Sequence, residues 1–229
     1  MALHLQTEIS KLKKKLLMLS SMVEANLSKA VQAVLNSDHE LAKKVIELDE
    51  DVDLLEIEVE EECLKILALH QPVAVDLRFV ISTLKINNDL ERIGDLTSNI
   101  AHRCMYMTKD KSSDIPFDFE DMSMKARQML KKAINSLINM DASLAHEVCR
   151  DDDELDHMNR INFKTTRQKI KESPDKVEFY LNWRSISKHL ERIGDYATNI
   201  SEDTIYMIEG VIIRHSHGEI ESDSSPQEY

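Results

Sequence analysis

The feature that most constrains the fold is a six-residue motif that occurs twice. Residues 90–95 read Leu-Glu-Arg-Ile-Gly-Asp, and residues 190–195 repeat them one hundred positions later. In both places an Asn-Ile pair follows, at 99–100 and 199–200. A second correspondence pairs residues 38–42 with residues 141–145, at an offset of 103. The chain is therefore an internal duplication, and the sequence predicts two halves built on one plan.

Helices dominate the predicted secondary structure. Apolar residues recur at three- and four-residue steps along most of the chain, which is typical of amphipathic helices, and only 4 Gly and 4 Pro interrupt them. We expect an N-cap within a capping box at Ser37–Glu40 and a helix end at Gly210. The expected helices span about 5–36, 37–69 and 72–107 in the first half, with the same plan repeated in the second half and a last helix over about 174–209.

Three long helices per half, joined by short turns, favour an up-down-up bundle. The predicted fold class is therefore all-α, with two tandem three-helix bundles related by internal duplication. We place the first bundle in residues 1–110 and the second in 115–210, because 109–118 is polar and contains a Pro. Residues 211–229 are polar and acidic, and we expect a mobile tail there.

The overall charge narrows the classes of partner. A formal net charge of -13 argues against nucleic acid, which needs clustered Lys and Arg, and favours bound cations or a basic partner surface. The 3 Cys are scattered and form no disulfide framework, which indicates a reducing cytoplasm. No apolar run approaches the roughly twenty residues that span a bilayer, so we expect membrane contact only through a partner.

Carboxylates in both halves form the candidate binding site. Residues four apart lie on one face of a helix, so two carboxylates at that spacing form a stacked pair of like charges that favours a cation. Such pairs occur on two helices of each half, which could bring four carboxylates to one edge of each bundle. They are Asp49 and Asp53 with Glu91 and Asp95 in the first half, and Asp152 and Asp156 with Glu191 and Asp195 in the second.

Several interpretations of these pairs remain open. The oxygen ligands could hold magnesium, calcium, manganese or a hydroxo-bridged iron cluster, and the pairs could also be solvated surface. In the second half, Arg184 and Lys188 could neutralise Glu191 without a metal. His102 could be an outer ligand or a solvated side chain. We find no Gly-rich phosphate loop, nucleophile elbow or zinc-type Cys/His pair, so the sequence indicates no covalent catalysis.

Taken together, these features resemble one family. The tandem Glu-Arg-Ile-Gly-Asp elements, the Gln-Pro-Val-Ala-Val-Asp-Leu-Arg segment at 71–78 and the two three-helix repeats resemble the PhoU family of phosphate-signalling regulators. The second repeat departs from the family pattern, because Ser-Pro-Asp-Lys at 173–176 replaces the segment at 71–78. The resemblance covers nearly the whole chain and implies a PhoU-like fold.

The resemblance also implies metal sites, with iron or zinc as the expected metals and manganese or magnesium as further candidates. The family's metal motif falls on Glu91 and Asp95, and on Glu191 and Asp195. Asp49, Asp53, Asp152 and Asp156 match by position on the neighbouring helices. Arg184 and Lys188 make occupancy of the second site the weaker expectation.

The implied function is a cytoplasmic negative regulator of phosphate uptake and of the phosphate-starvation response. Family members act as adaptors between the ATP-binding subunit of the phosphate ABC transporter and a phosphate-sensing histidine kinase, and we expect a homodimer. An adaptor is not an enzyme. The alternatives are a di-metal carboxylate-bridged hydrolase or oxidase, for which the sequence offers few His ligands, and an inert helical scaffold.

Overall fold

A computed structural model of the chain describes residues 2–107 and 115–211. Within these ranges all regular structure is helical and no β-strand occurs, which confirms the predicted all-α class. The elements are α1 (Ala2–Asn36), α2 (His39–Glu47), α3 (Asp49–His70), α4 (Ala74–Tyr106), α5 (Phe119–Asn139), α6 (Ala142–Glu172), the short 3₁₀ helix η1 (Pro174–Lys176) and α7 (Val177–Glu209).

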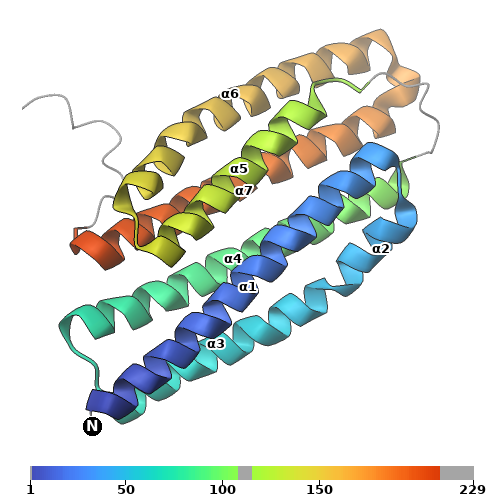
Figure 1. The fold of residues 1–229 in the computed structure, drawn as a ribbon. Helices are drawn as coiled ribbons and strands as arrows, with labels where there is room; N and C mark the ends of the chain where they lie inside the picture. The colour runs from blue at the N-terminus through green and yellow to red at the C-terminus, as the bar shows by residue number, and fades with distance from the viewer. Residues whose placement is uncertain (1, 108–114, 212–229) are drawn as a thin grey trace, which may run out of the picture.

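The two predicted three-helix bundles are present (Figure 1). In the first, α1 packs against α3 and α4, and α3 packs against α4; in the second, α5, α6 and α7 pack against one another. The helices α3 and α6 lie on opposite outer sides of the molecule (Figure 1). The predicted tandem arrangement is thus confirmed, and α3, which carries Asp49 and Asp53, lies on the opposite side of the molecule from α6, which carries Asp152 and Asp156.

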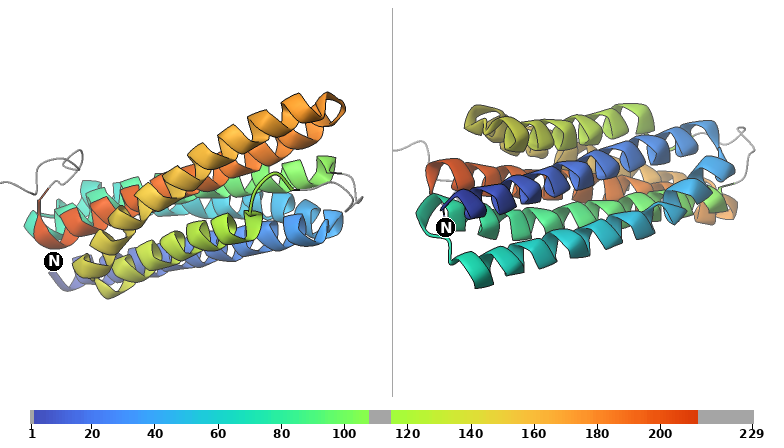
Figure 2. Two further views of the ribbon diagram at one scale, coloured as in Figure 1. Left: turned by 90° about the horizontal axis from the view of Figure 1, so that it is seen from above. Right: turned by 60° about the horizontal axis from the view of Figure 1, so that its bottom comes forward.

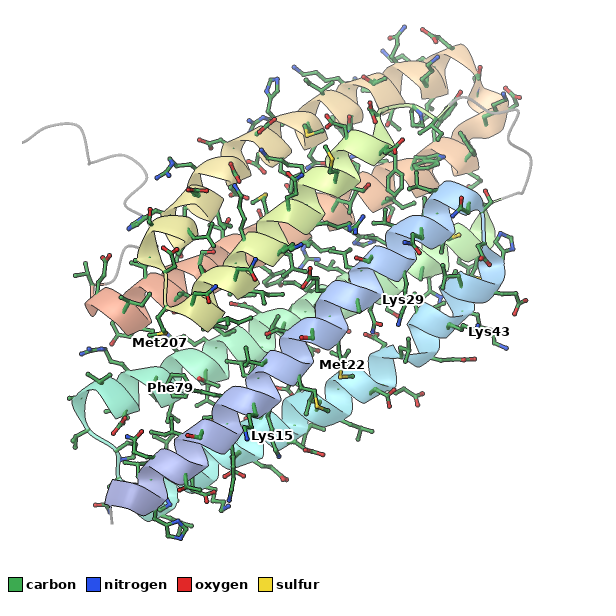
Figure 3. The ribbon with its side chains drawn as sticks, viewed as in Figure 1. Lys15, Met22, Lys29, Lys43, Phe79 and Met207 are labelled. Carbon is green, nitrogen blue, oxygen red and sulfur yellow. The ribbon has the colours of Figure 1, made fainter. Side chains whose placement is uncertain are left out.

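The bundles meet along α4 and α7, with a smaller contact between α1 and α5, which lie side by side in both views of Figure 2. Lys85 of α4 pairs with Asp203 of α7 at 3.3 Å, whereas Arg103 reaches Asn182 at 3.5 Å, so α4 and α7 run antiparallel. Phe79 of α4 and Met207 of α7 lie along this interface and belong to one apolar core that continues through both bundles (Figure 3).

The predicted second helix differs in two ways. It is broken at Leu48 into α2 and α3. Its N-cap is Asp38, whose carboxylate accepts a hydrogen bond from the Leu41 amide at 3.0 Å, and not Ser37 as the capping-box prediction implied. The prediction was wrong by one residue because Ser37 takes a left-handed conformation, with φ 51°, outside the helix. In the second bundle, Asp141 caps α6 through the Leu144 amide at 3.0 Å.

The turn between α3 and α4 also differs from the prediction. Gln71 ends α3 in a left-handed conformation and Val73 is extended, so α4 begins at Ala74 and Pro72 lies before its first turn. The predicted end of α7 is correct, because Gly210 has φ 74° and its amide donates to the Tyr206 carbonyl at 2.9 Å.

The remaining expectations are only partly addressed. The joint at 109–118 lies mostly outside the described residues, and so does the expected tail at 211–229, apart from Val211. The domain boundaries at 110, 115 and 210 stay predictions. None of the described helices combines the length and the apolar character needed to cross a membrane.

Candidate functional site

The structure brings the four carboxylates of the first half to one side of the first bundle. We call Asp49, Asp53, Glu91 and Asp95 the first acidic cluster. Partial burial, followed by the charge of Asp95, raises the pKa of both Asp53 and Glu91. Burial is also the main cause of the raised pKa of Asp49, to which Asp53 and Asp95 contribute. The four groups are thus close enough for their negative charges to repel one another.

Gly94 lets α3 and α4 approach closely at this point. A methyl group at Gly94 would place its carbon 3.1 Å from Cγ1 of Val52 and 3.2 Å from Oδ1 of Asp49. Both distances are shorter than ordinary van der Waals contact, so a larger residue would push the Asp49 carboxylate away from α4. Ser98, one turn after Asp95, hydrogen bonds with Asp49 and partly offsets the rise in its pKa.

Few cations reach the first acidic cluster. The Arg92 guanidinium lies 3.4 Å from Glu91 and 3.3 Å from Asp95. It is half exposed, and exposed pairs of this kind contribute little stability, about 0–1 kcal/mol. His102 also lowers the pKa of Asp49 through its charge, although weakly. Arg92 therefore binds these carboxylates only weakly.

The second half repeats this geometry. We call Asp152 and Asp156 of α6, with Glu191 and Asp195 of α7, the second acidic cluster. Burial, followed by the charge of Asp156, raises the pKa of Asp152 to about 6. Partial desolvation, followed by the charges of Glu191 and Asp152, raises the pKa of Asp195 to about 6 as well. Gly194 again allows the approach, since a methyl carbon there would lie 2.5 Å from Cδ2 of Leu155 and 3.5 Å from Oδ1 of Asp152.

The two clusters differ at their glutamates. Glu191 is only 8% exposed, and Lys188 donates to both of its carboxylate oxygens at 2.7 and 2.6 Å. Asn159 donates a further hydrogen bond to it at 3.0 Å. The predicted neutralisation of Glu191 by Lys188 is therefore present. Arg184 contributes through Asn159, because its guanidinium donates to the Asn159 side-chain oxygen at 2.8 Å.

An open groove between the bundles adjoins the second acidic cluster. Its volume is about 730 Å³, and Lys85 of α4 crosses it to Asp203 of α7 at 3.3 Å. Acidic and amide side chains dominate the walls, so the groove extends the negative surface of the cluster toward the first bundle. The lining residues are Leu84, Lys85, Asn88, Asp89, Asp152, Asp195, Thr198, Asn199, Glu202 and Asp203.

The side chains of both clusters are of the type that binds cations, but they are not arranged as the ligands of a metal ion. All four predicted ligands in each half are carboxylates, the groups that hard cations and iron accept. Burial, and after it the repulsion of neighbouring carboxylates, raises the pKa of Asp49, Asp53, Glu91, Asp152 and Asp195, and a bound cation would relieve that repulsion. As the side chains stand, however, no group of three or more His, Cys, Asp or Glu within residues 2–107 and 115–211 is arranged to hold a metal ion.

Sequence reasoning missed two contributors to each cluster. Gly94 and Gly194 are part of the repeated motif and allow close approach of Asp49 and Asp152. Ser98 and Thr198, at equivalent positions, place a hydroxyl beside the same two carboxylates. The internal repeat could have revealed both contributors, because each position has the same kind of residue in the two halves: glycine at 94 and 194, and a hydroxyl residue at 98 and 198.

Comparison with known proteins gives matches along nearly the whole chain. The model of the PhoU domain matches twice, at residues 16–104 and 119–204. The phosphate-specific transport system accessory protein PhoU homolog 1 of Thermotoga maritima is 31% identical over 222 residues, which is 96% of each chain.

Solved structures share the fold. The crystal structure of PhoU from Pseudomonas aeruginosa superimposes with a TM-score of 0.86 at 32% identity, over 90% of this chain and 99% of that one. The phosphate transport system regulatory protein PhoU from Streptococcus pneumoniae gives a TM-score of 0.81 at 27% identity, over 91% and 98% of the two chains.

Proposed function

This chain belongs to the PhoU family, and from that premise we propose that it regulates phosphate transport as an accessory protein. The observation that carries the proposal is that both repeats match the PhoU domain. We further propose that it represses phosphate uptake and the starvation response when phosphate is plentiful. It would do so on the cytoplasmic side of the membrane, held there by its partners.

We propose an adaptor and not an enzyme. The partners would be the ATP-binding subunit of the phosphate ABC transporter and the phosphate-sensing histidine kinase. Two similar bundles packed together along α4 and α7 support this role, because they offer two related surfaces on one chain. A second copy of the chain is a further proposed partner, as a homodimer.

We propose that metal ions bind the acidic clusters, with the first cluster as the stronger site. Asp49, Asp53, Glu91 and Asp95 would hold the ion after Arg92 moves aside. A weaker site would consist of Asp152, Asp156 and Asp195, because Glu191 already accepts a hydrogen bond from Lys188. Iron or zinc is the expected metal, with manganese or magnesium as alternatives. The bound cation would reverse a local negative charge and let an acidic or phosphorylated partner surface approach.

The adaptor proposal is tested by deleting the gene and measuring phosphate uptake in phosphate-rich medium. We expect uptake to rise and to return to its original level when the wild-type chain is restored. Purified chain should also capture the ATP-binding subunit and the kinase from detergent extracts of the same cells. Unchanged uptake together with no capture of either partner would contradict the proposal, and metal-dependent hydrolysis or oxidation by the purified chain would favour the enzyme alternative.

A further inference from the structure

A pocket lined by several basic side chains lies on the second bundle and borders the second acidic cluster, since its residues Arg160 and Asn159 contact Asp156 and Glu191. Its volume is about 430 Å³. We call it the cationic pocket, and α6 supplies all of its lining except one residue from α7. The lining residues are His157, Asn159, Arg160, Ile161, Phe163, Lys164 and Arg184.

Arg184 is held rigidly in this pocket. Its guanidinium donates to the Asn159 side-chain oxygen at 2.8 Å, and its central carbon lies 5.3 Å from the centre of the Phe163 ring, a cation–π contact. Asn159 is itself 93% buried and is fixed by hydrogen bonds to Ser187 and Glu191. Burial lowers the pKa of Arg184, yet an arginine keeps its charge at any physiological pH. A preorganised cation therefore borders the pocket.

Nearby carboxylates balance the positive charge of the pocket only in part, because the negative charge of Glu191 acts on Arg184 and raises its pKa against the larger effect of burial. Arg160 pairs with Asp156 at 3.3 Å. In the part of the chain that the structure describes, no carboxylate oxygen lies within 4.0 Å of the Lys164 ammonium or the Arg184 guanidinium. Three cations thus face a concave surface: Arg160 is paired with Asp156, Arg184 is partly offset by Glu191, and Lys164 makes no ion pair within the described residues, so the surface suits an anion.

The first bundle shows that this charge is not a requirement of the fold. The positions that correspond to Lys164 and Arg184 are Glu61 and Leu84. The first repeat has glutamate or aliphatic side chains at the other lining positions, where the second repeat has His157, Asn159, Arg160, Ile161 and Phe163. Those other positions are Leu54, Glu56, Ile57, Glu58 and Glu60.

We propose that the cationic pocket binds a phosphoryl dianion, either inorganic phosphate or a phosphate monoester. Arg184 would donate bidentate hydrogen bonds to two of the oxygens, and Lys164 would add a mobile charge that closes over the ligand. This proposal rests on the residues of the pocket and does not depend on the proposed function or on metal binding. The phosphoryl site can therefore be absent while the proposed function holds, and the reverse.

The test is calorimetric titration of the full-length, chelator-treated protein with inorganic phosphate at constant ionic strength. We expect saturable binding that weakens at least tenfold in the Lys164→Gln, Arg184→Gln double variant. Lys164→Glu alone changes only an exposed side chain, so it should weaken binding without affecting folding. The matched control, Lys44→Gln with Arg150→Gln, removes two exposed cations elsewhere and should bind as the wild type does.

Parallel titration with O-phosphoserine distinguishes the two sources of the phosphoryl group. Binding of both ligands supports a general phosphoryl site, whereas binding of one alone identifies the source. Absence of saturable binding by the wild type, or equal binding by the double variant, would overturn the proposal. So would a wild-type dimer that becomes monomeric in Lys164→Glu and binds no phosphate, because the cations would then serve an interface between copies.

Discussion

The two repeats share a framework and differ in the charge laid over it. Both use a capping aspartate before the second helix and a glycine where the helices cross. Around the clusters they diverge: Glu91 pairs with the half-exposed Arg92, while Glu191 is buried against Lys188 and Asn159. Duplication has kept the packing positions alike, while the polar positions have diverged in charge. Our proposals of a stronger cation site in the first repeat and an anion pocket in the second follow from this divergence.

The largest predicted effects concern the shared framework and should be equal in the two repeats. Leu90 and Leu190 are both fully buried in the continuous core. Leu90→Ala and Leu190→Ala should each lower the free energy of unfolding by about 2–5 kcal/mol through lost contacts and a residual cavity. Urea denaturation measures this, with the exposed Leu54→Ala as control. A loss below about 1 kcal/mol in only one repeat would show that the cores are not equivalent.

The next prediction exchanges the residues that distinguish the clusters. Asn88→Lys introduces near Glu91 the cation that Lys188 supplies in the second repeat, and it should lower metal affinity of the first cluster about tenfold, or ~1.4 kcal/mol. Lys188→Asn should raise the affinity of the second cluster by a similar factor. Competition with a chromophoric chelator measures both. Unchanged metal affinities in both variants would show that the charges at positions 88 and 188 do not control metal binding.

Helix caps should contribute equally in both repeats. Asp38→Ala and Asp141→Ala each remove a side-chain acceptor for an N-terminal amide and should lower stability by about 1 kcal/mol. Ser37→Ala is the control, because Ser37 lies outside the helix in a left-handed conformation. Thermal unfolding provides the measurement. A larger effect from Ser37→Ala than from Asp38→Ala would restore the capping box that the sequence suggested.

The smallest effect depends on pH and belongs to the second repeat. The pKa of Asp195 rises from 3.8 to about 6 on folding, so between those values the folded chain holds more protons than the unfolded chain. Stability therefore falls as pH rises through this range. In metal-free buffer at pH 7.5, Asp195→Asn should stabilise the protein by less than about 1 kcal/mol, since Asp195 is exposed and screened by solvent.

The same stabilisation should vanish below about pH 4, where the carboxyl is protonated in both states. Melting temperatures between pH 4 and pH 8 measure this trend, with Glu61→Gln, an exposed carboxylate outside the clusters, as control. A stabilisation that is independent of pH would mean that the carboxylate is not strained in the folded state.

The sequence predicted the framework well and the local chemistry less well. Helical periodicity and duplication identified the two bundles, because packing depends on apolar spacing that a wheel displays directly. Two helix starts lie later in the chain than predicted: the cap is Asp38 and not Ser37, and α4 begins at Ala74 and not at Pro72. In both cases a residue in the left-handed conformation, Ser37 or Gln71, precedes the helix, and residue spacing does not indicate such a conformation.

Two features of the clusters lay beyond helical periodicity. The burial of Glu191 and the position of Arg184 behind Asn159 depend on how α6 and α7 pack against each other. The cationic pocket was missed because its residues share no motif and come together only across two helices.

The most direct test is the metal content of untagged protein purified without chelator, measured by plasma mass spectrometry. Wild type is compared with two double variants. The first carries Glu91→Gln and Asp95→Asn, and the second carries Glu191→Gln and Asp195→Asn. We predict stoichiometric metal in the wild type, its loss in the first variant and substantial retention in the second. No metal in the wild type even after reconstitution, or metal unaffected by Glu91→Gln, Asp95→Asn, would contradict the assignment of the first acidic cluster as the stronger cation site.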